Sequence, residues 1–170
     1  MAIEIERKFL VANDGWKSLV CRSMSIKQAY LSSNGRFSAR VRIKGQGAGE
    51  SATFTIKAAR AGLQRAEFEY VIPTADALEM MPLRHGAIIE KVRHVVPFEG
   101  MEWEIDVFLG QNTGLTVAEV ELQTEDQEIA LPSWIGAEVT SDRRYYNSSL
   151  TVLPFSQWTT IGKEQVVKAK

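Results

Sequence analysis

Ionisable side chains recur at every second position along much of this chain, in an arrangement that could bind a polyanion together with a divalent metal ion. Residues two apart on a strand lie about 6.6 Å apart on the same side. A carboxylate pair at that spacing, as in Glu4 and Glu6, can bind a divalent cation. An arginine pair, as in Arg40 and Arg42, can hold two successive phosphoryl groups, because each planar guanidinium binds phosphate oxygens with two nitrogens.

The elements that must position these residues are strands. Alternation of polar and apolar residues predicts about eight β-strands, which are expected at residues 3–9, 26–32, 36–44, 53–58, 65–70, 91–96, 102–107 and 117–122. Asn34-Gly35 and Glu99-Gly100 predict hairpin turns. Helices are expected to be few, at residues 14–20, 74–81 with Thr74 as N-cap, 124–129 and 141–153.

Two arrangements of these strands fit the pattern. In the first, the charged faces point to solvent from an open sheet or sandwich, as charged strand faces usually do. In the second, the sheet closes into a barrel with a charged lumen, and helices pack on its apolar exterior. Cations and carboxylates recur in the same register in nearly every strand, and the helices are too few to fill a sandwich core. Pattern alone leaves both arrangements open.

Composition excludes several other classes. The 170 residues are 45% hydrophobic and 24% charged, which is typical of one globular domain. A net charge of −1 gives no electrostatic case for nucleic acid or an anionic membrane. One cysteine, Cys21, and two histidines, His85 and His94, exclude an internal disulfide and a thiolate or histidine-rich metal centre. No apolar run reaches the roughly 18 residues of a membrane helix, and no signal peptide is evident, so a cytoplasmic protein is expected.

The segment Glu4-Ile5-Glu6-Arg7-Lys8 resembles the Glu-x-Glu-x-Lys signature of the CYTH family, also called triphosphate tunnel metalloenzymes. Later segments follow in the order of the family's motifs. They are Arg40-Val41-Arg42, Thr55-Ile56-Lys57, Arg65-Ala66-Glu67-Phe68-Glu69, Lys91-Val92-Arg93, Trp103-Glu104-Ile105-Asp106, Glu119-Val120-Glu121 and Glu138-Val139-Thr140 with Asp142 and Tyr145. The resemblance predicts a CYTH domain at residues 1–153 and leaves residues 154–170 as a tail without an assigned role.

The resemblance implies a mainly β (α+β) fold, an eight-stranded antiparallel closed β-barrel that forms a tunnel with a charged lumen and a few helices outside. It implies an enzyme that binds a triphosphate-bearing small molecule with one or two divalent ions, Mg²⁺ or Mn²⁺, which prefer oxygen ligands. The chain is most similar to small bacterial inorganic triphosphatases, which release pyrophosphate and phosphate. An organic triphosphate enzyme (thiamine triphosphatase or adenylyl cyclase) and a non-catalytic polyphosphate- or nucleotide-binding module are the alternatives.

The resemblance also implies roles for individual residues. Phosphate binding is expected of Lys8, Arg40, Arg42, Lys57, Arg65, Lys91 and Arg93. Metal binding is expected of Glu4, Glu6, Glu104, Asp106, Glu119 and Glu121. Catalytic roles are expected of Lys8, Tyr30, Glu67 and Glu69.

In this scheme Glu67 and Glu69 position the attacking water or hold a second metal. Lys8 and Tyr30 face each other across the tunnel and assist proton transfer or hold the terminal phosphate. Lys44 is expected either at the tunnel mouth or in solvent. No nucleic-acid or membrane partner is expected, and the apolar outer faces are compatible with a homodimer.

Overall fold

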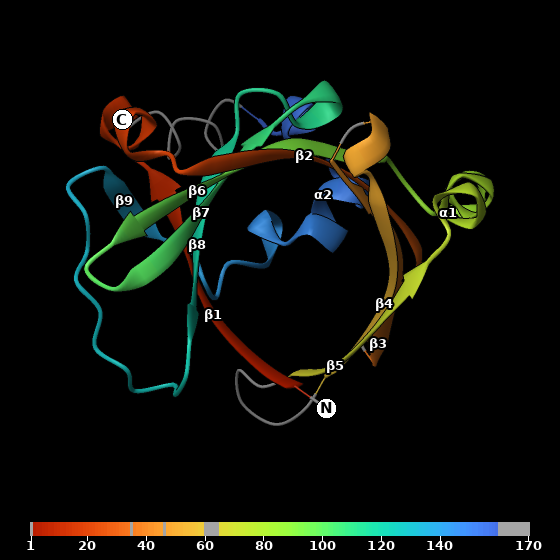
Figure 1. The fold of residues 1–170 in the computed structure, drawn as a ribbon, viewed down its shortest axis with the longest axis horizontal. Coiled ribbons are helices and arrows are strands. Elements are labelled where there is room, and N and C mark those ends of the chain that lie inside the picture. Colours follow the sequence, from red (N-terminus) through yellow and green to blue (C-terminus); the bar gives the residue numbers. More distant parts are fainter. Residues whose placement is uncertain (1, 35, 46, 60–64, 160–170) are drawn as a thin grey trace.

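The computed structural model describes residues 2–34, 36–45, 47–59 and 65–159, with the backbone alone described at residues 2–4, 48, 59 and 65. Within these ranges, nine strands form one antiparallel sheet (Figure 1). The strands are β1 (Ala2–Val11), β2 (Arg22–Ser33), β3 (Phe37–Lys44), β4 (Ser51–Ala59), β5 (Arg65–Ile72), β6 (Ile89–Phe98), β7 (Met101–Phe108), β8 (Thr116–Leu122) and β9 (Ile135–Glu138).

The strand order closes the sheet into a barrel. The order is β5-β4-β3-β2-β6-β7-β8-β1-β9, and the start of β1 also pairs with β5, with Ala2 opposite Glu67 and Glu4 opposite Arg65. Strands β1–β8 therefore form a ring, which Figure 1 shows from one open end. The predicted eight-stranded antiparallel barrel is confirmed. The added strand β9 pairs with the far end of β1, where Phe9 lies opposite Glu138.

The period-two alternation of the strands separates a charged interior from an apolar exterior. On β3, Arg40 and Arg42 point into the barrel, whereas Val41 and Ile43 pack outside in a cluster with Met81. A larger outer cluster packs around Trp103, and a third contains Tyr145, Leu150 and Trp158 near the C-terminal end. The first two clusters therefore lie outside the barrel, whereas the third includes the inward-facing Leu10, Phe108 and Val117 and closes one end of the charged lumen.

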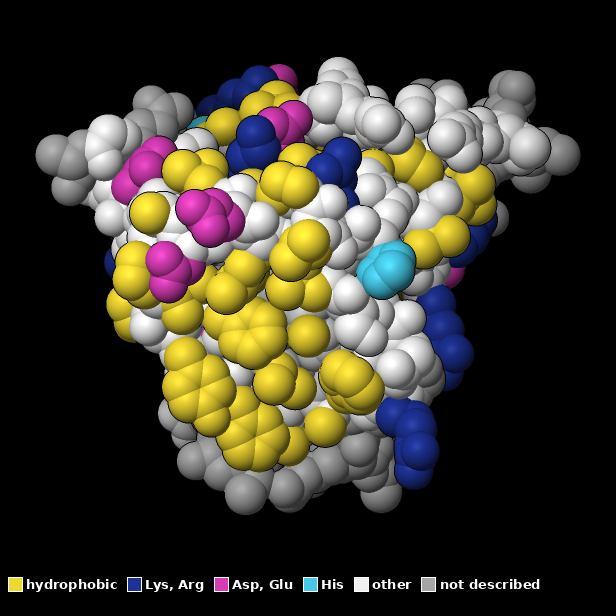
Figure 2. Space-filling model, turned by 90° about the vertical axis from the view of Figure 1, so that its right-hand side faces the viewer, with side chains coloured by type: hydrophobic (Ala, Val, Ile, Leu, Met, Phe, Trp, Pro, Cys, Tyr) yellow, Lys and Arg dark blue, Asp and Glu magenta, His cyan; other side chains and the backbone are white. Residues whose placement is uncertain are grey.

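Part of the apolar exterior is uncovered. Helix α1 (Thr74–Met80) packs over one end of β3 and β4. Beyond it, apolar side chains gather on one face of the molecule (Figure 2). Phe37, Phe68 and Tyr70, on β3 and β5, are 40%, 40% and 57% exposed. We call these three residues the outer aromatic patch.

The predicted helices are partly confirmed. The helix expected at residues 74–81 forms as α1 (Thr74–Met80), but its N-cap is Pro73, so the assignment of Thr74 as N-cap was wrong. Residues 14–20 form a 3₁₀ helix, Asp14–Leu19. The expected helix at 124–129 is wrong, because only a turn forms there. Six residues without an apolar packing face gain too little to offset helix nucleation.

The expected helix at 141–153 is interrupted. It divides into a 3₁₀ helix, Arg143–Tyr145, and helix α2 (Asn147–Val152), because Tyr146 is extended with φ −72° and ψ 136°. The Asp142 side chain accepts a hydrogen bond from the Arg144 N–H and caps the first piece. Further 3₁₀ helices lie at Gly47–Gly49, Met81–Leu83, Gly110–Asn112 and Phe155–Gln157.

The Glu99-Gly100 hairpin is confirmed between β6 and β7, with φ 47° and 77° as such a tight turn requires. Gly35 of the other predicted turn, and most of the expected tail, lie outside the described residues. None of the helices in the described ranges has the length and apolar character needed to cross a bilayer.

Candidate active site

The barrel encloses a cavity of about 330 Å³ whose lining is almost entirely polar. Six cationic and six carboxylate side chains border it among the described residues. The cations are Lys8, Arg40, Arg42, Lys44, Lys57 and Arg93, and the carboxylates are Glu6, Glu67, Glu69, Glu104, Glu119 and Glu121. The prediction of a charged lumen is confirmed, and the open sheet with solvated charged faces is excluded.

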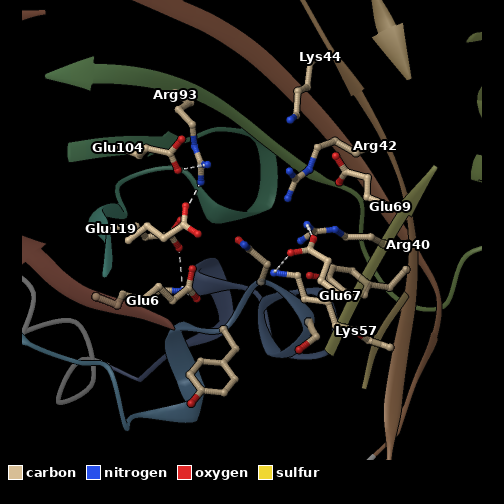
Figure 3. A pocket seen from close by; sticks show the side chains of 17 residues that line it. Glu6, Arg40, Arg42, Lys44, Lys57, Glu67, Glu69, Arg93, Glu104 and Glu119 are labelled. Carbon is tan, nitrogen blue, oxygen red and sulfur yellow. Dashed lines mark hydrogen bonds and ion pairs between the residues drawn. The ribbon is translucent and has the colours of Figure 1, made fainter. Parts of the chain in front are cut away.

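The charges are divided between two walls that face each other (Figure 3). Strands β3–β5 contribute four cations and two carboxylates, so this wall, the basic wall, has an excess of positive charge. Strands β1, β6, β7 and β8 contribute two cations and four carboxylates, so this wall, the acidic wall, has an excess of negative charge. The lumen is therefore polarised although its formal charges cancel.

Ion pairs connect the side chains of the acidic wall. The Lys8 Nζ lies 2.8 Å from Glu119 Oε1 and 3.8 Å from Glu6 Oε1. Arg93 donates to Glu119 Oε2 at 2.7 Å and also contacts Glu104. Burial lowers the pKa of Lys8, but Glu119 and Glu6 outweigh it and raise that pKa above its usual value. Lys8 therefore stays protonated in the lumen.

Lys91 and Asp106 lie behind this wall and do not border the cavity. Both are at most 1% exposed, and the Lys91 ammonium contacts the Asp106 carboxylate directly. Arg93 forms a two-point contact with Asp106, at 2.7 Å and 2.6 Å. Burial raises the pKa of Asp106, but Arg93 and Lys91 outweigh it, so that pKa is lowered and Asp106 is ionised.

The basic wall has looser pairing. Glu67 lies 3.7 Å from both Arg40 and Lys57. The Thr55 hydroxyl donates to Glu69 at 2.9 Å. Burial raises the pKa of Glu69, but the Thr55 hydrogen bond and nearby cations outweigh it and lower that pKa.

Two cations of the basic wall differ from the rest. Among the described residues, neither Arg42 nor Lys44 has an acidic side chain within ion-pair distance. The Arg42 Nε donates instead to the neutral Gln28 Oε1 at 3.1 Å. Burial, Arg40 and Arg93 lower the pKa of Arg42 to about 10, and burial and Arg42 lower that of Lys44. An anion in the cavity would supply the counter-charge that both lack.

Sequence reasoning missed the residues that line the cavity from the C-terminal segment, namely Tyr146, Asn147 and Ser148. A hydrogen bond connects this segment to β1, where the Lys8 backbone N–H donates to Thr140 Oγ1 at 3.0 Å. The Tyr146 hydroxyl donates to the Thr140 carbonyl at 3.2 Å, and the Lys8 Nζ lies 5.6 Å from the centre of the Tyr146 ring. The sequence predicted a helix over residues 141–153, but its pattern does not show which residues of that segment face the barrel, because this depends on tertiary packing.

The donors suit a metal that prefers oxygen. Glu6, Glu104, Glu119 and Glu121 border both the main cavity and a smaller one of about 160 Å³, which Glu102 also lines. Carboxylate-only donors favour Mg²⁺, Mn²⁺ or Ca²⁺. In the described ranges no three such side chains already converge on one point.

A polyanion in the charge-balanced lumen would bring uncompensated negative charge, which a divalent ion offsets. The Glu4 and Arg65 side chains, also expected in the site, lie outside the described residues.

An antiparallel barrel with a cation-rich wall opposite a carboxylate-rich wall defines a tunnel protein built for a polyanion and a metal ion. Comparison with known families agrees, since residues 2–154 match the CYTH domain. The chain belongs to the CYTH family, whose triphosphatases act with a divalent metal ion.

Two curated relatives cover nearly the whole chain. It is 40% identical over 159 residues to an inorganic triphosphatase of Acetivibrio thermocellus, covering 93% of this chain and 99% of that protein. It is 35% identical over 154 residues to an inorganic triphosphatase of Nitrosomonas europaea, covering 88% and 97%. The crystal structure of the inorganic triphosphatase NE1496 superposes with a TM-score of 0.64 at 33% identity, covering 89% of this chain and 96% of that one.

Proposed function

We propose that this chain is a divalent-metal-dependent hydrolase that converts inorganic triphosphate to pyrophosphate and phosphate. One observation carries the proposal: in the part of the chain that the structure describes, Arg42 and Lys44 of the basic wall have no acidic partner and lie opposite a wall of carboxylates. A linear polyanion offers both cations a counter-charge, and the carboxylates can hold the metal that offsets its remaining charge. The activity of the two curated relatives supports the same reaction.

The lining also favours a substrate without an organic group. Among the described residues, the aromatic side chains that border the cavity are Tyr30 and Tyr146. The Lys8 ammonium lies over the Tyr146 ring, so that face is not free to stack on a base. Recognition of a purine or thiazolium would need an exposed aromatic face.

The chain's own residues would divide the chemistry between the walls. Arg40, Arg42 and Lys44 would bind phosphate oxygens along β3, with Lys57 beside them. A divalent ion, Mg²⁺ or Mn²⁺, held by Glu6, Glu119 and Glu121 would supply positive charge that neutralises phosphate oxygens and acidifies a water molecule.

In the hydrolysis, a water oxygen bonds to a terminal phosphorus while the bridging P–O bond breaks. Glu67 or Glu69 would position that water and accept its proton. Lys8, which its carboxylate neighbours keep protonated, would donate to the departing pyrophosphate oxygen, with Tyr30 beside the phosphates. Lys91 and Asp106 would act through Arg93, because neither borders the cavity.

Product analysis tests the proposal. The full chain is incubated with triphosphate, ATP or thiamine triphosphate and Mg²⁺ or Mn²⁺, and phosphate, pyrophosphate and cyclic AMP are measured. We expect phosphate and pyrophosphate in equal amounts from triphosphate, and far slower turnover of the other two. Cyclic AMP from ATP would establish a cyclase instead, and tight binding of triphosphate without turnover would establish a binding module.

A pair of variants separates the metal site from general acidity of the barrel. Glu6→Gln should abolish metal-dependent phosphate release, because it removes one carboxylate that borders the lumen. Glu102→Gln is the matched control, since Glu102 lies in the same acidic region but is 61% exposed and pairs with Arg22. Full activity in Glu6→Gln would contradict the metal assignment.

The cytoplasmic location and the homodimer expected from the sequence stay predictions. Two copies would associate through the outer aromatic patch, because it is the apolar face that α1 leaves uncovered (Figure 2). Light scattering after size exclusion should then give twice the 19.0 kDa chain mass, and Tyr70→Ser should restore the monomer. A wild-type monomer at micromolar concentration would exclude this dimer.

A further inference from the structure

Gln28 lies directly opposite Arg42 in the register of β2 and β3. Its side chain is fully buried, and its Oε1 accepts the hydrogen bond from the Arg42 Nε at 3.1 Å. Gln28 does not border the cavity, so a bound substrate cannot reach it. Any effect of Gln28 on the reaction must therefore pass through Arg42.

Burial of this amide and this guanidinium lowers the stability of the fold. Among the described residues, the buried Gln28 Nε2 has no hydrogen-bond partner, and Arg42 is a buried cation next to Arg40 and Arg93. Buried polar groups are normally satisfied, and buried cations are normally paired with an acid. A glutamate at position 28 would have the same shape and would pair with Arg42, which would remove both costs.

The choice of an amide has a consequence for binding. A neutral acceptor at Nε fixes the guanidinium without cancelling its charge, and it leaves the edge formed by the two terminal nitrogens for a ligand. Arg93 shows the opposite arrangement, because Asp106, Glu104 and Glu119 already occupy its nitrogens. Arg42 is thus oriented and still available, whereas Arg93 is oriented by its acidic partners.

We infer that Gln28 is a positioning residue that orients Arg42 toward the substrate phosphate and preserves its uncompensated charge. The inference rests on the proposed function, in which Arg42 binds triphosphate. It also explains why a buried amide nitrogen is left without a partner at this point of the barrel.

Two variants test the inference. Gln28→Glu should raise the KM for triphosphate about 10-fold or more with a smaller change in kcat, because an internal carboxylate then competes for Arg42. The same variant should raise the melting temperature of the ligand-free protein, because Arg42 gains a counter-ion. Gln28→Met keeps the volume but removes the acceptor, so KM should rise without any gain in melting temperature. Gln157→Glu is the control for added charge, because Gln157 is exposed and is not among the residues that border the cavity.

A double variant shows whether the effect passes through Arg42. In an Arg42→Met background, Gln28→Glu should add no further increase in KM, whereas independent effects would multiply. An unchanged KM in both single variants, with wild-type turnover intact, would overturn the inference and leave the proposed function standing.

If the wild type shows no turnover, calorimetry of triphosphate binding in EDTA still tests the inference. The proposed function then fails, but Gln28→Glu should still weaken triphosphate binding and raise the melting temperature. Equal dissociation constants for wild type and Gln28→Glu would overturn the inference there too.

Discussion

Replacing Asp106 by Asn should destabilise the barrel even when no metal is present. The Asp106 carboxylate contacts both Lys91 and Arg93 and is 1% exposed. Asparagine has nearly the same shape but carries no charge, so the variant leaves Lys91 as a buried ammonium without its counter-ion. Arg93 loses one of three acidic partners and keeps Glu104 and Glu119.

The size of the effect follows from the burial of the pair. Removing one partner of a buried ion pair costs about 3–5 kcal/mol, because the other charge stays desolvated. For a chain of this length, each kcal/mol moves the melting temperature by about 2–4 °C. The Asp106→Asn protein should therefore melt roughly 6–20 °C below the wild type.

The loss of stability of Asp106→Asn relative to the wild type should depend on pH. Burial lowers the pKa of Lys91 to about 8 although Asp106 raises it, so loss of Asp106 must lower that pKa further. Between the pKa of Lys91 in the folded chain and its higher pKa in the unfolded chain, the unfolded chain binds more protons. Stability therefore rises with pH in that range, and the range is wider in the variant. The difference between variant and wild type should be largest below neutrality and should narrow as pH approaches 8.

Thermal melts and urea titrations in EDTA measure this difference. Glu104→Gln is the control, because Glu104 also contacts Arg93 but its side chain is 38% exposed, so its loss should cost much less. An Asp106→Asn melting temperature equal to that of the wild type would refute the reasoning. It would then favour the role of metal ligand that the family resemblance implied for Asp106.

Three further predictions concern the lumen. Arg42→Met should raise the melting temperature of the ligand-free protein, since no described acidic side chain pairs with Arg42. The same variant should raise KM about 10- to 100-fold, as charged hydrogen bonds contribute about 1.5–3 kcal/mol; a lower melting temperature would contradict the first expectation. Lys44→Met should raise KM by roughly 2- to 5-fold, while Lys27→Met, whose ammonium pairs with Glu90 outside the cavity, should leave steady-state kinetics unchanged. EDTA should abolish phosphate release and excess Mg²⁺ or Mn²⁺ should restore it; activity that persists in EDTA would exclude metal dependence.

The charged residues that share one face of a strand could be predicted from the sequence. Strand pleating fixes the period at two, so Arg40, Arg42 and Lys44 had to share one face of β3. Closure of the sheet then had to place that face either inside or outside. The apolar faces include Trp103 and Ile105, which are fully buried outside the barrel, and their burial requires the charges to point inward.

The depth of each residue along the lumen could not be predicted. Lys91 and Arg93 have the same charge and lie on the same predicted strand face, and the same holds for Glu104 and Asp106. Lys91 and Asp106 nevertheless lie behind the residues that line the cavity. Their end of the barrel is covered, since the Lys91 Nζ lies 5.4 Å from the Phe108 ring centre and Phe108 packs against the C-terminal cluster. That cluster depends on the tertiary packing of the C-terminal segment, for which the sequence predicted a helix at residues 141–153 but not the surface on which it packs.

The ion-pair partners of the charged residues could not be predicted from the sequence either, and these partners matter most for function. Register places Asp106 opposite Arg93, and Glu119 opposite both Lys8 and Glu104, so these cations find acids on neighbouring strands. Arg42 lies between Gln28 and Thr53, and neither neighbour can be ionised. The same inward-facing motif therefore yields a saturated ion-pair network on one wall and an unsatisfied cation on the other. Arg42, like Lys44 on the same strand, therefore gains most from binding an anion, because on the saturated wall a phosphate would have to displace a carboxylate already in place.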